Sequence, residues 1–151
     1  MLELLAPAGN LDAVIAAVQN GADAVYMGFG DGFNARRSAD NFTRESFAKA
    51  VRYCHIRGCK VYVTLNTLVG DREMEAAAAL AQQASDAGAD AILVQDLGLA
   101  RVLRDALPDI PLHASTQMSI HNLAGVEAAA EMGITRAVLS REHSHEQIRN
   151  I

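Results

Sequence analysis

A short glycine-containing phrase recurs along this chain and constrains its fold more than any other feature. The sequence NGADAV at residues 20–25 returns almost unchanged as AGADAI at residues 87–92. In both copies the glycine follows an amphipathic stretch and precedes a short apolar run. Glycine ends helices because it adopts the left-handed conformation without a Cβ clash. A short apolar run is typical of a strand buried on both faces. The phrase therefore predicts a helix-to-strand joint.

Further joints follow the same plan and define six βα units. Looser copies of the phrase lie at residues 57–61 and 132–138, and a proline-containing joint lies at 108–111. Helical patterns alternate with the apolar runs, and such strict alternation predicts an α/β fold with a parallel sheet covered by helices. The strands are expected at residues 2–5, 23–27, 60–65, 90–94, 111–114 and 136–139.

Two architectures fit this alternation, an open doubly wound sheet and part of a (β/α)8 barrel. The glycine-rich dinucleotide fingerprint is missing after the first strand, where residues 6–10 read APAGN, and the regular repeat favours the barrel. A closed barrel needs eight units and roughly 250 residues, whereas this chain has 151. We therefore predict a single domain, residues 1–151, forming a truncated, partial TIM-type barrel of six parallel units. Its first and sixth strands would be bare edges, so the chain is either a fragment of a larger barrel or has these edges covered by something else.

Helix starts can also be predicted. Ser144, followed three residues later by Gln147, has the pattern of a capping box opening a sixth helix. Side chains able to accept a hydrogen bond from the first turn are N-cap candidates for the helices before it. These candidates are Asn10, Thr43, Asp71 and Asp96.

Composition limits the class of protein. The chain is 50% hydrophobic and 21% charged, which is ordinary for a soluble globular domain. A net charge of −5 argues against a broad phosphate-binding face but leaves room for a local basic pocket. The N-terminus lacks the pattern of a signal peptide and no stretch could span a membrane. The two cysteines fit a reducing compartment, so we expect a cytoplasmic protein.

Polar residues follow the strands where parallel β/α folds bind ligands, at the carboxyl ends. Strand alternation places Asn66 and Ser115 on the barrel-facing side, where they should converge. Arginines at such a mouth can grip carboxylate or phosphate. For any one of these residues the alternative role is helix or loop capping. The candidate substrate-binding residues are Asn34, Arg36, Asn66, Ser115, Gln117 and Arg141.

No catalytic or metal constellation stands out. Cys54 continues an apolar helical stripe and Cys59 begins a strand, so both read as buried structural thiols rather than metal ligands. His113 is expected in the barrel interior. Ser115 is the single candidate nucleophile, without an evident base.

Six segments along the chain together resemble the U32 peptidase family, the collagenase-like proteins of bacteria. The resemblance runs in order through almost the whole sequence. Its segments are ELLAPAGN at 3–10, NGADAVYMG at 20–28, NAR at 34–36, VYVTLN at 61–66, LHASTQ at 112–117 and VLSRE at 138–142.

The resemblance implies a barrel that continues past the sixth unit, and three readings of function. Some members of the family look like enzymes that hydroxylate a pyrimidine of transfer or ribosomal RNA, which is the main expectation here, with RNA or a small molecule as substrate. The family name implies a peptidase instead. A non-catalytic, self-associating barrel is the third reading. Several members hold a [4Fe–4S] cluster on four cysteines downstream of the matched segment, and neither Cys54 nor Cys59 matches these ligands, so no cofactor is expected on this segment itself.

Overall fold

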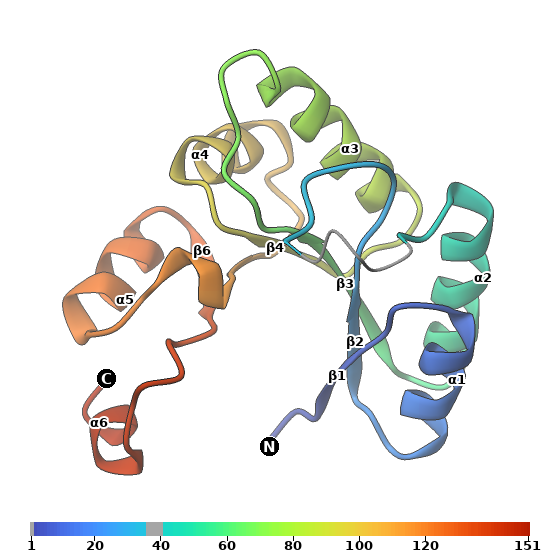
Figure 1. Ribbon diagram of the computed structural model, residues 1–151, viewed down its shortest axis with the longest axis horizontal. Helices are drawn as coiled ribbons and strands as arrows, with labels where there is room; N and C mark the ends of the chain where they lie inside the picture. Colours follow the sequence, from blue (N-terminus) through green and yellow to red (C-terminus); the bar gives the residue numbers. More distant parts are fainter. Residues whose placement is uncertain (1, 36–40) are drawn as a thin grey trace.

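Six strands form one sheet in chain order in the computed structural model, which describes residues 2–35 and 41–151 (Figure 1). Every neighbouring pair of strands runs parallel. In an open doubly wound sheet the strand order reverses at a switch point, whereas here it never does. The partial (β/α)8 barrel predicted from the sequence is therefore confirmed. The strands are β1 (Leu5–Pro7), β2 (Ala24–Met27), β3 (Lys60–Leu65), β4 (Ala91–Val94), β5 (Leu112–Ala114) and β6 (Ile134–Ala137).

The helices that connect successive strands lie along the convex side of the curved sheet, and both chain ends lie on its open side (Figure 1). A short 3-10 helix, η1 (Thr116–Met118), follows β5. The α-helices are α1 (Leu11–Gln19), α2 (Arg44–His55), α3 (Met74–Asp86), α4 (Leu97–Ala106), α5 (Leu123–Glu131) and α6 (His145–Arg149).

The recurring phrase ends the helix and fixes the register of the following strand at the helix-to-strand joints. Its glycines, Gly21 and Gly88, have φ angles of +88° and +98°, as expected for residues that end a helix in the left-handed conformation. Its aspartates fix the register of the next strand. The Asp90 amide donates to the Val61 carbonyl, and the Asp90 carboxylate accepts from the Val61 amide, both at 2.7 Å. Asp23 makes the same pair of bonds to Leu4, at 2.9 and 2.7 Å.

The two faces of the sheet differ as strand alternation predicts. Val61 and Val63 of β3 pack into the cluster beneath the first helices, whereas Tyr62 between them lies with Leu93 on the concave face. Thr64 and His113 are also buried. The concave face therefore carries the larger and more polar side chains, and it is the face on which the strands present their functional groups.

Most of the predicted helix starts are confirmed. Asn10, Thr43 and Asp96 each accept a hydrogen bond from the first turn of their helix, and Ser144 forms the expected capping box. The N-cap assigned to Asp71 is wrong, because α3 begins only at Met74. A turn ahead of α3 explains why the helix starts later than predicted. The Glu73 carboxylate accepts from the Gly70 amide at 2.9 Å and closes this turn.

Two strands are displaced from their predicted positions. The first was expected at residues 2–5, but β1 starts at Leu5 because the Leu4 amide is occupied by the Asp23 carboxylate. The last was expected at 136–139, but β6 starts at Ile134. Gly133, at φ +80°, turns the chain out of α5 and directly into the sheet. The apolar runs extend beyond the ladders in both cases, so hydrophobicity alone misplaced these bounds.

Candidate functional site

A cavity of about 170 Å³ opens at the carboxyl ends of the strands. This is the end of a β/α barrel at which ligands bind. Four of the six residues predicted from the sequence lie in its wall. The lining residues are Leu5, Tyr26, Ala35, Thr64, Asn66, Leu93, Ser115, Thr116, Gln117, Val138 and Arg141.

Asn66 and Ser115 meet at the base of this cavity, as the strand alternation predicted. The Asn66 Nδ2 donates to Ser115 Oγ at 3.1 Å, and Asn66 Oδ1 accepts from the Ala35 amide at 3.1 Å. The Gln117 amide also donates to Ser115 Oγ, at 3.3 Å. Because the Ala35 and Gln117 amides can only donate, they fix the orientation of both side chains.

This network leaves hydrogens available to a ligand. A hydroxyl accepts two hydrogen bonds and donates one, and both acceptor positions of Ser115 Oγ are filled. The hydroxyl hydrogen of Ser115 is therefore unused, and so is the second Nδ2 hydrogen of Asn66, whose first hydrogen goes to Ser115 Oγ. No acceptor for either hydrogen lies among the residues that the structure describes. Asn66 and Ser115 therefore present two adjacent donors at the cavity.

The remaining wall combines apolar, neutral polar and cationic side chains. Leu5, Leu93 and Val138 provide apolar surface, and Arg141 provides a guanidinium at the rim. No carboxylate is among the lining residues. The site therefore suits a ligand with a flat apolar body and with acceptor or anionic groups.

The sequence analysis missed Tyr26. Its neighbours Val25 and Met27 are buried beneath the helices, while Tyr26 is paired in register with Tyr62 and lines the cavity. The alternation used for the third and fifth strands would have found it in the second. A partly exposed aromatic ring of this kind is a surface on which a planar base can stack.

The other predicted site residues are placed differently. Arg36 lies outside the described residues. Asn34 is not among the lining residues, and its Nδ2 donates to Asn41 Oδ1 at 3.0 Å. Gln117 and Arg141 are exposed at the rim.

The loop that carries Arg141 is anchored to the segment after η1. The Ser140 amide donates to the Ile120 carbonyl at 3.1 Å. The ring of His143 bridges two carbonyl oxygens, with Nδ1 2.8 Å from that of Ser140 and Nε2 2.8 Å from that of His121. These bonds hold the arginine-bearing rim against the rim that carries Gln117.

The described residues give Ser115 no catalytic base. His113 lies two residues away on the same face, but its ring packs edge-on against Tyr62 with the centroids 4.9 Å apart. Burial lowers the pKa of His113 to about 4. No hydrogen bond joins this histidine to Ser115 in the part of the chain described, so the arrangement of a serine nucleophile with its base is not formed there.

The cysteines lie at the opposite ends of the strands from the cavity. Cys54 and Cys59 are both buried, and burial raises the pKa of Cys54 to about 12, which disfavours the thiolate needed of a metal ligand. A [4Fe–4S] cluster takes four thiolates, and this chain has two cysteines. Within the described ranges, no group of three or more His, Cys, Asp or Glu residues could hold a metal ion. The residues of this chain do not fit the cluster.

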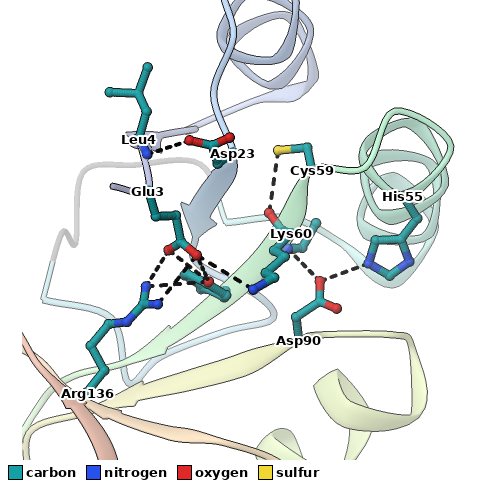
Figure 2. A network of polar contacts seen from close by, with 10 residues as sticks. Glu3, Leu4, Asp23, His55, Cys59, Lys60, Asp90 and Arg136 are labelled. Atoms are coloured by element: carbon teal, nitrogen blue, oxygen red, sulfur yellow. Dashed lines mark hydrogen bonds and ion pairs between the residues drawn. The ribbon is translucent and has the colours of Figure 1, made fainter. Parts of the chain in front are cut away.

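A polar cluster occupies the amino-terminal ends of the strands (Figure 2). Arg136 of β6 forms an ion pair with Glu3, and the Tyr62 hydroxyl donates to Glu3 at 2.9 Å. Lys60 Nζ lies 3.6 Å from the same carboxylate. The hydrogen bond from Arg136 is the main reason that the pKa of Glu3 is lowered. In β/α barrels this end contributes stability rather than catalysis, which is the role we assign to the cluster.

The fold and the cavity define a partial β/α barrel with a cavity at the carboxyl ends of its strands. A sequence model of peptidase family U32 matches residues 9–151. The chain belongs to this family, and the resemblance read from the strand ends is confirmed.

Three known proteins are similar to most of the chain. It is 42% identical over 150 residues to the 23S rRNA 5-hydroxycytidine C2501 synthase of Escherichia coli, and 39% identical over 149 residues to tRNA hydroxylation protein P1 of Bacillus subtilis; both alignments cover 99% of this chain. The solved structure of the U32 peptidase Mk0906 superposes on all of the chain with a TM-score of 0.81 at 15% identity, and the match covers 64% of that structure. That likeness concerns the fold.

The chain spans only part of these relatives, 22% of the E. coli protein and 35% of the B. subtilis protein. In the described ranges no helix is long and apolar enough to cross a membrane.

Proposed function

We propose that this chain is the base-binding part of an enzyme that hydroxylates a pyrimidine in ribosomal or transfer RNA. The observation that carries the proposal is the chemistry of the cavity wall. Asn66, Ser115 and Arg141 offer hydrogen-bond donors, and the lining residues include no carboxylate. The carbonyl oxygens and phosphate oxygens that a pyrimidine nucleotide presents are all acceptors.

The other wall residues suit the same ligand. Proteins that read single-stranded RNA stack splayed-out bases on aromatic rings, and Tyr26 supplies such a ring beside Leu93. Arg141 at the rim is suited to hold a phosphate bidentately. The E. coli and B. subtilis relatives described above, whose names specify RNA hydroxylation, align with 99% of this chain, which supports assigning the same class of substrate to this cavity.

The chain's own part in the reaction is binding and orientation. Replacing a ring C–H by C–OH is an oxidation, and the lining residues include no cysteine that could hold a redox cluster. A cluster of the kind held by some members of the family would take its four cysteines from outside these 151 residues. We place the protein in the cytoplasm, where its RNA substrate is found and where the two thiols stay reduced.

The RNA of the source organism provides the test. Deleting the gene should remove a pyrimidine nucleoside that is heavier by one oxygen atom from digested ribosomal or transfer RNA, as detected by mass spectrometry. The wild-type gene should restore it, and Arg141→Ala should restore much less of it than the matched surface variant Arg101→Ala. An unchanged set of nucleosides after deletion would refute the proposal.

A peptidase remains the second candidate because of the family to which the chain belongs. Protein cleavage by purified protein that is lost in Ser115→Ala would favour it over RNA hydroxylation. A self-associating barrel is the third, because β1 and β6 each have one unpaired side in the described sheet. Light scattering that gives a monomer would count against it.

A further inference from the structure

We propose that Asn66 and Ser115 make this cavity selective for cytosine over uracil. The inference rests on the proposed function, since it takes a pyrimidine as the ligand. It adds which pyrimidine is bound and which atoms of the protein select it.

The two donors form a fixed pair. The Asn66 Nδ2 and Ser115 Oγ atoms are 3.1 Å apart, and each is held by a main-chain amide that can only donate, from Ala35 and from Gln117 respectively. Rotating the Asn66 amide by 180° would place its NH₂ group against the Ala35 amide, donor against donor. The pair therefore cannot exchange a donor for an acceptor without losing the hydrogen bond from the Ala35 amide and leaving that donor against the NH₂ group.

The pair is complementary to the Watson–Crick edge of cytosine. That edge has two adjacent acceptors, N3 and O2, one for each donor. In uracil N3 carries a hydrogen, so one of the two protein donors would face another donor. A buried donor without an acceptor is costly, and sites built to hydrogen-bond a ligand discriminate strongly on this ground.

The surroundings favour a neutral base over an anion at this point. Ser115 is only 4% exposed, and the nearby wall is formed by the neutral side chains of Tyr26, Leu93 and Thr64. The Thr64 hydroxyl is already committed, since it donates to the Met27 carbonyl at 3.1 Å. The charged donor, Arg141, lies at the exposed rim, where the phosphate of a bound nucleotide would be.

The experiment compares two mononucleotides on the 151-residue chain. Cytidine and uridine 5′-monophosphate are titrated into labelled protein, and the dissociation constants are taken from amide chemical shifts. We expect cytidine monophosphate to bind about tenfold more tightly, equivalent to ~1.4 kcal/mol. In Asn66→Asp the carboxylate still accepts from Ala35 but offers an acceptor to the ligand, so the preference should reverse toward uridine monophosphate. Asn150→Asp, the same change at the exposed residue that follows α6, should keep the wild-type ratio.

A second variant covers failure of Asn66→Asp to fold, which thermal unfolding would reveal. Ser115→Ala removes one donor and should reduce the preference for cytidine monophosphate several-fold. Equal binding of both nucleotides, binding of neither, or an unchanged ratio in a folded Asn66→Asp would each overturn the selectivity. The proposed function is judged separately, because loss of a hydroxylated pyrimidine on gene deletion would support it even if the cavity proved indifferent to the base.

Discussion

Glu3 and Arg136 form an ion pair that joins the two ends of the six-stranded sheet, although 133 positions separate them in the sequence (Figure 2). Glu3 precedes β1 and Arg136 belongs to β6, and these two strands are not paired with each other. The Tyr62 hydroxyl, from the middle of the sheet, donates to the same carboxylate at 2.9 Å. The cluster thus holds the sheet in its curved form at the end opposite the cavity.

Removing this ion pair should destabilise the fold measurably. The side chains are 22% and 39% exposed, so solvent weakens the attraction, and we expect a coupling of about 1 kcal/mol. The measurement is a double-mutant cycle of Glu3→Gln and Arg136→Gln by urea unfolding. The exposed pair Glu45 and Lys49 on α2 is the control and should couple more weakly, because solvent screens exposed ion pairs. Equal coupling in the two cycles would mean that Glu3 and Arg136 do not hold the edges together.

The repeated aspartates should matter for stability more than other surface aspartates. Asp90→Ala removes the carboxylate that accepts from the Val61 amide and that contacts His55 Nε2. An amide left unpaired lowers the free energy of unfolding by about 1–3 kcal/mol. Asp90→Asn keeps an acceptor and should cost less. Urea unfolding and the hydrogen-exchange rate of the Val61 amide provide the readouts, with the exposed Asp109→Ala as control. A Val61 amide that exchanges no faster in Asp90→Ala would show that the register does not depend on this contact.

The buried His113 should weaken the fold in acid. Burial lowers its pKa from 6.5 to about 4, so the unfolded chain takes up a proton in a pH range where the folded chain does not. The stability that the neutral ring contributes is complete above pH 6.5 and is lost as the pH falls toward 4, at up to about 1.4 kcal/mol per pH unit. In His113→Phe the free energy of unfolding should depend less on pH between 6.5 and 4. The surface variant His145→Phe should keep the wild-type pH dependence.

The imidazole of His143 should titrate above its ordinary pKa. Both ring nitrogens lie 2.8 Å from carbonyl oxygens. Because only the doubly protonated ring can donate to both oxygens, these bonds raise the pKa of His143. The negative charge of Glu142 raises it further, by a smaller amount. The contribution of His143 to anchoring the Arg141 loop is therefore complete below the ordinary pKa and is lost as the pH rises through the raised one.

Nuclear magnetic resonance can follow both parts of this prediction. The ring signals of His143 should give a midpoint above that of the same histidine in urea-unfolded protein, and the Arg141 amide should shift with the same midpoint. A midpoint at or below the unfolded value would contradict the doubly donating ring.

Much of the site could be predicted because strand alternation is a local property. Once residues 60–65 are read as a strand, Asn66 must point to the same side as Tyr62 and Thr64, and the same reasoning places Ser115 with His113. Asn34 shows the limit of this reasoning. It lies in a loop without a period, and there the hydrogen bond to Asn41, rather than any pattern in the sequence, decides where the side chain goes.

The sequence by itself determined the order of the elements, the parallel sheet and the family, since these follow from periodicity, joint glycines and motifs that act over a few residues. The tertiary structure alone decided the starts of β1 and β6 and the ion pair of Glu3 with Arg136. Each of these depends on contacts between strands far apart in the chain. The physical reason is that an edge carboxylate, or a ring on a concave face, acquires its partner only when the sheet curves and brings distant residues together.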